Sequence, residues 1–242
     1  MISRMLRKHR WNQVTGTVPR LQREPHATSY FGQYHQDRFV AELFDQKRGG
    51  FFVDIGANDG VSFSNTYYFE NFLGWSGIAF EPHPIVYRQL SASRTCATVN
   101  AGVGPANTIM KFSCVDVGAA MLSGFTETFD SGHRRRIRRE VRKAGVKIRE
   151  IDVPTLRLAD VMADHKRDTI DYLSLDTEGG ELEILRSIDF DRFYVRCLSI
   201  ENNSKNLAIH RYMSGLGFRL SAIAGCDEIY VHSSVPNRMQ AA

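Results

Sequence analysis

The chain has 242 residues, of which 43% are hydrophobic and 24% charged, and its formal net charge at pH 7 is +4. These proportions are typical of a folded globular protein and exclude a disordered or fibrous chain. No apolar run approaches the length of a membrane span, and no apolar stretch follows the basic N-terminal segment, so we expect a cytoplasmic protein.

Residues 1–28 form a polar segment interrupted by Pro19 and Pro25, which we expect to be a poorly ordered or loosely packed lead-in to a single domain over residues 29–242. Hydrophobic periodicity then predicts an alternation of strands and helices. Helices are predicted over residues 36–44, 66–73, 85–92, 156–162 and 181–188, and strands from residue 51 and over 77–81, 97–101, 172–176 and 195–201. A hairpin-like pair is predicted around residues 108–115, and two closing strands at 218–222 and 228–232 give an antiparallel end. The alternation predicts an α/β fold with a mainly parallel sheet.

A glycine-rich turn follows the first strand of this domain, where residues 51–60 read FFVDIGANDG. Gly56 and Gly60 let the backbone come close to a ligand, and Asp54 lies at the carboxyl end of the strand, where open α/β sheets bind their ligands. Glu81 ends the next apolar run, 21 residues after Gly60. A carboxylate at that place can accept both hydroxyls of a ribose, so the pattern predicts a nucleoside cofactor.

The spacing of the glycines narrows the choice of cofactor. In the dinucleotide fingerprint G-x-G-x-x-G the middle glycine makes room for a pyrophosphate, and here Asn58 takes its place between Asp54 and Asp59. Acidic and amide groups suit the sulfonium and ammonium of S-adenosylmethionine better than they suit a pyrophosphate. We therefore favour S-adenosylmethionine, and NAD is the alternative.

Parallel strands bring their last residues to one edge of the sheet. That edge is predicted to hold Asp54, Glu81, Asn100, Asp176 and Glu201. Asp176 opens the segment DTEGGE, in which two glycines permit close approach of a substrate. A carboxylate there can orient an acceptor hydroxyl or take its proton, so we expect Asp176, Glu178 and Glu201 to be the catalytic residues.

The same residues allow a second interpretation. Asp176, Glu201 and Asn202 offer three oxygen ligands for Mg²⁺, which would acidify a substrate hydroxyl. In a purely structural alternative, Glu178 and Glu181 cap the following helix and Asn202 begins a turn. The sequence leaves both open.

A basic segment lies between the two halves of the domain. Residues 133–149 hold nine Lys and Arg and one Glu, so the rest of the chain carries 22 basic and 26 acidic residues. We interpret it as an insertion at about residues 130–150, near the site. It can contact nucleic acid, a membrane surface or a phosphorylated substrate, or it can be a solvated helix with Ile137 and Val141 inward. No aromatic residue lies among the bases, which argues against nucleic acid.

Five separated motifs together resemble the FkbM-type methyltransferases. They are VDIGANDG at residues 53–60, SNT at 64–66, FEP at 80–82, VNAGVG at 99–104 and DYLSLDTEGGE at 171–181. The resemblance covers about residues 30–232. It is specific because all five occur in the right order, whereas the first alone would indicate only a nucleoside-binding α/β domain.

The resemblance implies the Rossmann-like class I fold of S-adenosylmethionine-dependent methyltransferases, with a seven-stranded, mainly parallel sheet, an antiparallel last strand and helices on both faces. It places the methionine part of the cofactor beside Asp54, Gly56, Asn58 and Gly60. The ribose would lie beside Glu81, and the adenine beside Asn100 and Ala101. Asp176 and Glu178 fall on the segment that faces the acceptor. Two positions depart from the family, which often has lysine in place of Ser174 and histidine in place of Asn202.

The sequence thus predicts an O-methyltransferase that acts on a hydroxyl of a sugar, a glycan or a glycosylated metabolite, whether neutral or anionic. An NAD-dependent oxidoreductase is one alternative. A non-catalytic adaptor on the same fold, which would dock an acidic partner or a membrane through the basic segment, is the other.

Overall fold

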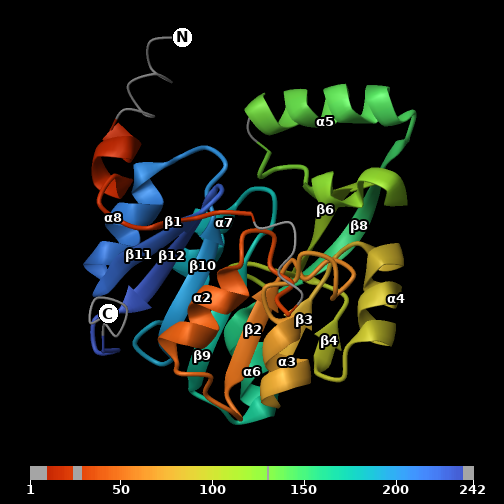
Figure 1. The fold of residues 1–242 in the computed structure, drawn as a ribbon. Helices are drawn as coiled ribbons and strands as arrows, with labels where there is room; N and C mark the ends of the chain where they lie inside the picture. The colour runs from red at the N-terminus through yellow and green to blue at the C-terminus, as the bar shows by residue number, and fades with distance from the viewer. Residues whose placement is uncertain (1–9, 24–28, 130, 237–242) are drawn as a thin grey trace.

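The computed structural model describes residues 10–23, 29–129 and 131–236, and a large sheet forms its centre (Figure 1). Eight strands lie in the order β1-β11-β12-β10-β9-β2-β3-β4. Their bounds are β1 Arg20–Leu21, β2 Phe51–Ile55, β3 Ser76–Phe80, β4 Ala97–Val99, β9 Thr169–Leu175, β10 Tyr194–Glu201, β11 Phe218–Ala224 and β12 Asp227–His232. β12 is antiparallel to both β10 and β11, and the other pairs are parallel.

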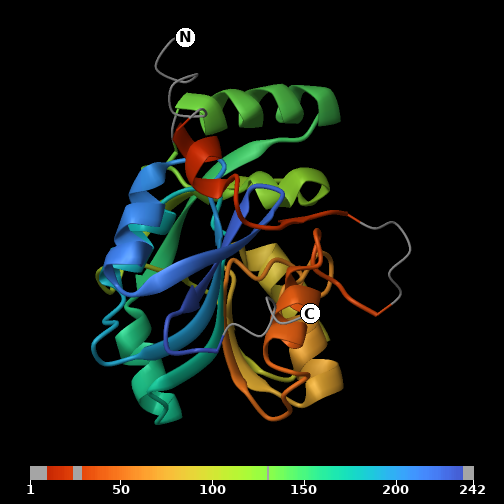
Figure 2. The same cartoon turned by 60° about the vertical axis from the view of Figure 1, so that its left-hand side comes forward.

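Helices cover both faces of this sheet (Figure 2). They are α2 Gln36–Leu43, α3 Tyr67–Leu73, α4 Pro84–Ser93, α6 Leu158–His165, α7 Glu181–Ser187 and α8 Leu207–Gly215. Alternate residues of each central strand point to opposite faces. Val53 and Leu173 pack in a cluster with side chains of α6, α7 and α8, whereas Phe52 and Tyr172 pack with side chains of α2 and α3. The predicted α/β fold is therefore confirmed.

A second sheet stands beside the rim of the large one. Its order is β5-β8-β6-β7, with β5 Gly102–Val103, β6 Thr108–Val115, β7 Gly124–Phe125 and β8 Ile148–Leu156. The short helix η1 (Val117–Leu122) and helix α5 (Ser131–Ala144) lie between these strands in sequence. The hairpin-like pair predicted at residues 108–115 thus has its long partner, β8, on the far side of the basic segment.

Two sequence predictions need correction. The sheet has eight strands where seven were predicted, because the N-terminal segment adds β1 at the edge. That segment is also not loosely packed over residues 10–23, since Trp11 is fully buried and its indole N–H donates to the Glu228 carboxylate. Residues 1–9 and 24–28 of the predicted lead-in lie outside the described residues. Across the ranges that the structure covers, none of the helices is both long and apolar enough to span a membrane.

Candidate active site

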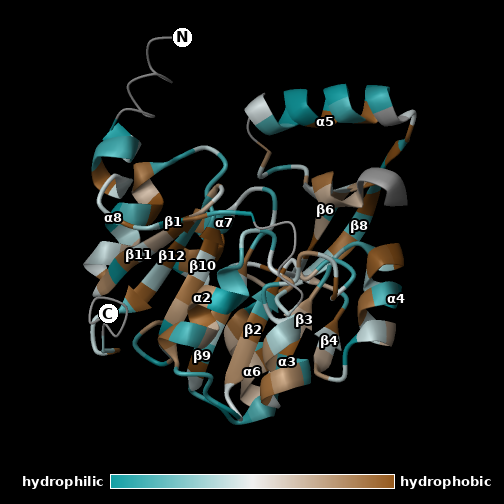
Figure 3. Ribbon diagram, viewed as in Figure 1, coloured by the Kyte–Doolittle hydropathy of each residue, from teal (hydrophilic) through white to brown (hydrophobic). Residues whose placement is uncertain are grey.

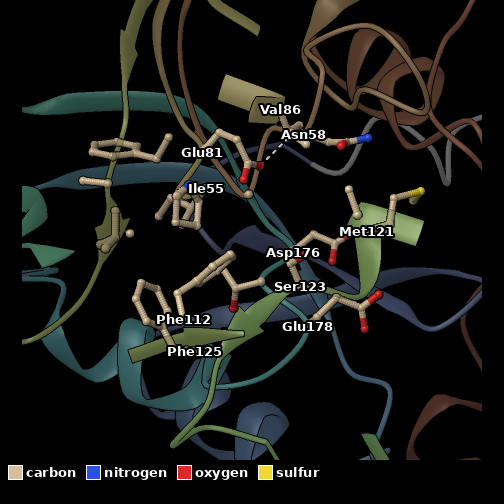
Figure 4. Close-up of a pocket in the computed structure, with 18 of the residues that line it drawn as sticks. Ile55, Asn58, Glu81, Val86, Phe112, Met121, Ser123, Phe125, Asp176 and Glu178 are labelled. Carbon is tan, nitrogen blue, oxygen red and sulfur yellow. Dashed lines mark hydrogen bonds between the residues drawn. The ribbon is translucent and has the colours of Figure 1, made fainter. Parts of the chain in front are cut away.

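A pocket lies between the carboxyl ends of β2, β3 and β9 and the second sheet (Figure 4). The large sheet contributes Gly56, Glu81 and Asp176 to its lining, and the second sheet contributes Phe112 and Phe125. In Figure 4 the two phenylalanine rings lie on one side of the pocket, and the carboxyl groups of Asp176 and Glu178 lie on the other. The pocket therefore has one apolar end and one acidic end.

Gly56 makes possible the turn that follows β2 and lines the pocket. Its φ is +90°, and its amide donates to the carbonyl of Phe80 at the end of β3. A β-carbon at this position would lie 1.8 Å from the carbonyl oxygen of Asp176. The backbone of β9 is thus too close for any side chain here, so glycine is required by the protein's own packing.

We expect Gly56→Ala to destabilise the fold by more than about 3 kcal/mol, because left-handed strain of roughly 1–3 kcal/mol adds to a clash with backbone. Gly49→Ala is the matched control, since Gly49 also has a positive φ of 67° but open space around its β-carbon position. Urea unfolding measures both. A similar loss in the two variants would contradict the packing argument.

Glu81 holds the turn from the other side. One carboxylate oxygen accepts the amide of Asn58 at 2.9 Å and the other accepts the amide of His83 at 2.7 Å. Burial raises the pKa of Glu81 to about 7, against the two backbone hydrogen bonds, which lower it. A carboxylate has about four lone-pair positions, so this one can still accept the two hydroxyls of a ribose.

The apolar end of the pocket was not predicted from the sequence. Phe112 and Phe125 meet edge to face with ring centroids 5.3 Å apart, and both line the pocket. A β-carbon at Gly102 would lie 2.3 Å from the ring of Phe125, so the glycine makes room for it. A flat aromatic group such as adenine fits walls of this chemistry.

Asp176 dominates the acidic end. It is half-buried, and loss of solvent together with nearby Asp227, Glu178 and Glu181 raises its pKa well above the ordinary range. It is hydrogen-bonded to Glu201, which ends β10 and whose pKa burial and Asp176 also raise well above the ordinary range. Two carboxyl groups in contact cannot both ionise easily, so the pair holds a proton to higher pH than an isolated carboxylate does.

Glu178 lines the pocket next to Asp176 but is paired with the basic segment. Its carboxylate lies 2.8 Å from the guanidinium of Arg136 and 3.4 Å from the imidazole of His133. Burial raises the pKa of Glu178 to about 7, and the charge of Arg136 opposes this. The glycines that follow do not make room for a substrate as predicted, since Thr128 packs against both.

Several predicted cofactor residues lie behind the pocket instead of in its lining. Asp54 accepts the hydroxyl of Thr66 at 2.6 Å, and a β-carbon at Gly60 would meet the side chains of Leu90 and Arg94. The side-chain amide of Asn100 donates to the backbone carbonyl of Glu81 at 2.8 Å. Asp54, Gly60 and Asn100 therefore hold the neighbouring segments in place and do not line the pocket. Of the residues predicted to hold the cofactor, Gly56, Asn58, Glu81 and Ala101 line the pocket.

The predicted Mg²⁺ site is not supported. Asn202 is engaged elsewhere, because its amide donates to Glu228 at 2.8 Å and its oxygen accepts the amide of Asn206 at 2.7 Å. Among the residues described, no three His, Cys, Asp or Glu side chains are grouped so that they could hold a metal ion. Asp176 and Glu201 therefore face each other as an acid pair, while Asn202 fixes the loop after β10.

The buried acids predict an unusual dependence of stability on pH. The pKa values of Glu81 and Glu178 are raised from 4.5 to about 7, so the folded state binds more protons than the unfolded state between these limits. Stability is then greatest at low pH and falls as pH rises through 7. We expect urea unfolding to show a lower free energy at pH 8 than at pH 5.5, with about 2 kcal/mol from Glu81 alone, because about one unit of its shift is already lost at pH 5.5. Stability that rises over this window would contradict the burial argument.

Comparison with known proteins relates this chain to methyltransferases. The family described as Methyltransferase FkbM domain matches residues 54–220, which confirms the resemblance seen in the five motifs. Three solved structures are similar. A METTL16 MTase domain has 12% identity over 95% of this chain and 79% of that chain, with a TM-score of 0.46. Methyltransferase FkbM from Methylobacillus flagellatus KT has 14% identity over 76% of this chain and 44% of that chain, with a TM-score of 0.44, and a human methyltransferase 10 domain containing protein has 10% identity over 95% of this chain and 94% of that chain, with a TM-score of 0.43. No curated protein sequence matches the chain.

Proposed function

This chain belongs to the family of methyltransferase FkbM domains, and from that premise we propose that it transfers a methyl group from S-adenosylmethionine to a hydroxyl of a sugar, a glycan or a glycosylated metabolite. One observation carries the proposal. A single pocket is lined by Glu81 from the end of β3 and by Asp176 from the end of β9, and the backbone of Gly56 contacts both strand ends.

The residues of the pocket fit this cofactor. Glu81 would accept the ribose hydroxyls, and Phe112 and Phe125 would flank the adenine. The methionine part would then lie along Gly56 and Asn58, toward the acidic end. S-adenosylmethionine, when bound, supplies a methyl group on a cationic sulfonium, and buried carboxylates nearby favour a cation over a pyrophosphate.

Asp176 is placed to act on the acceptor. A hydroxyl oxygen that forms a bond to a methyl carbon must lose its proton, and a carboxylate within hydrogen-bond reach can orient the hydroxyl and take that proton. Asp176 faces the pocket, and Glu201 contacts it through a hydrogen bond. This arrangement supports transfer to oxygen.

Membership of a methyltransferase family argues against the NAD-dependent oxidoreductase alternative. The geometry of the turn after β2 argues against it as well. The amide of Asn58 is held by the carboxylate of Glu81 at 2.9 Å, so it does not point into an open phosphate cradle. A non-catalytic adaptor would not need a polar pocket with an acid pair at one end.

Titration calorimetry tests the proposal. S-adenosylmethionine and S-adenosylhomocysteine should each bind at one site, with dissociation constants on the order of micromolar, while NAD should give no heat. Formation of S-adenosylhomocysteine in the presence of neutral and phosphorylated oligosaccharides then identifies the acceptor class. Failure of both sulfur nucleosides to bind would reject the proposal.

A further inference from the structure

Helix α5 carries the densest positive charge of the described chain. Its 14 residues read SGHRRRIRREVRKA, in which seven Arg and Lys accompany a single acidic residue, Glu140. Figure 3 shows it as a strongly hydrophilic helix that stands apart from the large sheet, beyond β6 and β8. The pocket chemistry described above does not explain so many cations.

The inward face of α5 is already used to attach the helix. Ile137 is buried in a small apolar cluster with Val115 and Leu122, and Arg134 donates to the backbone carbonyls of Thr126 and Phe129 at 2.8 and 3.2 Å. The few apolar side chains of α5 therefore face the protein. An amphipathic helix that lies in a membrane needs such side chains on its outer face.

One arginine of α5 reaches the pocket itself. Arg136 is paired at 2.8 Å with Glu178, whose carboxyl group lines the acidic end beside Asp176. The helix thus begins at the rim of the pocket where the acceptor would enter. Any acceptor longer than one sugar that places a hydroxyl at Asp176 would extend past this rim.

Beyond that rim, α5 carries further exposed cations. Arg138 and Arg142 are exposed and one turn apart, and no other described residue forms an ion pair with either of them. Arg142 lies six positions after Arg136, which is about 9 Å along the axis of the helix. Guanidinium groups bind phosphate oxygens in pairs of parallel hydrogen bonds, more strongly than they bind a single neutral acceptor.

We propose that the outer face of α5 binds phosphate groups of an extended, soluble acceptor whose methylated hydroxyl reaches Asp176. The inference rests on the proposed function and adds the class of acceptor. The acids of the pocket would repel an anion close to the reacting hydroxyl, so the phosphates must lie at a distance, as α5 places them. No Phe, Tyr or Trp lies on α5 for stacking of bases, and the ring of His133 packs against Phe129, which favours a phosphorylated glycan over single-stranded nucleic acid.

Fluorescence anisotropy with a labelled linear polyphosphate tests the surface directly. The variant Arg138→Glu with Arg142→Glu should bind it about tenfold more weakly or worse, because two attractive contacts become repulsive. The matched control is Arg186→Glu with Arg211→Glu, which makes the same change of charge on exposed positions of α7 and α8. The control should bind polyphosphate nearly as the natural chain does.

Equal weakening in both variants would overturn the proposal, since only overall charge would then matter. Tighter binding of the natural chain to phosphatidylglycerol vesicles, or to polyuridylate, than to polyphosphate would overturn it in favour of a membrane or a nucleic acid. S-adenosylhomocysteine binding, measured on the same samples, should be unchanged in the α5 variant. If the natural chain does not bind S-adenosylhomocysteine, the proposed function is rejected. The polyphosphate measurement would still decide whether α5 binds phosphate groups.

Discussion

Asp176→Asn is expected to abolish most methyl transfer and to leave cofactor binding nearly unchanged. The amide keeps the shape of the side chain but can no longer take a proton, and loss of a positioned acid or base lowers rates by about 10²- to 10⁴-fold. Because burial disfavours the charged form of Asp176, the neutral amide should also make the fold more stable at pH 8. Turnover of S-adenosylmethionine, calorimetry with S-adenosylhomocysteine and urea unfolding measure the three effects.

Two further variants separate chemistry from general effects of charge. Asp164→Asn changes an exposed carboxylate of α6 outside the pocket lining and should leave turnover as it was. Glu201→Gln leaves Asp176 without an ionisable partner in hydrogen-bond contact, so the acidic limb of the pH–rate profile should follow one ionisation instead of the two of a coupled pair. Turnover by Asp176→Asn within tenfold of the natural chain would exclude Asp176 as the base.

The large sheet could be predicted from the sequence because its strands and helices are local patterns. Each central strand, such as β2, is a short apolar run with glycine or acid after it, and α3 and α7 have helical spacing. Helix α8 was not predicted, although Asn206 caps its first turn by accepting the amide of Ala208. β8 was also missed, because charged residues and Pro154 obscure its alternation.

The errors in the site follow from the same limits. Motif spacing places Asp54 at the correct strand end, but side chains alternate along a strand, so Ile55 faces the pocket while Asp54 faces Thr66 on the other side. The aromatic wall comes from the second sheet, and the pairing of β6 with β8 brings together segments on either side of α5. A linear motif carries no information about such a long-range pair.

The second large effect is expected for Glu81→Gln, which should weaken S-adenosylmethionine binding by about 100-fold. Hydrogen bonds to a charged acceptor contribute roughly 1.5–3 kcal/mol each, and a neutral amide that must also satisfy the amides of Asn58 and His83 retains at best part of that. The pocket should otherwise remain intact, because the two side chains have the same size. Calorimetry at pH 8 gives the loss, and Glu42→Gln, the same change at an exposed position of α2, should give none.

The dependence of affinity on pH distinguishes a ribose acceptor from a residue that only supports the turn. Burial raises the pKa of Glu81 to about 7, so the natural chain should bind more tightly as pH rises from 6 to 8, where the carboxylate becomes ionised and can accept both hydroxyls. Stability falls over the same interval, so tighter binding there cannot come from a more stable fold. Affinity of Glu81→Gln should be nearly independent of pH. If the variant keeps the rise in affinity, another group is responsible for it, and Glu81 then only holds Asn58 in place.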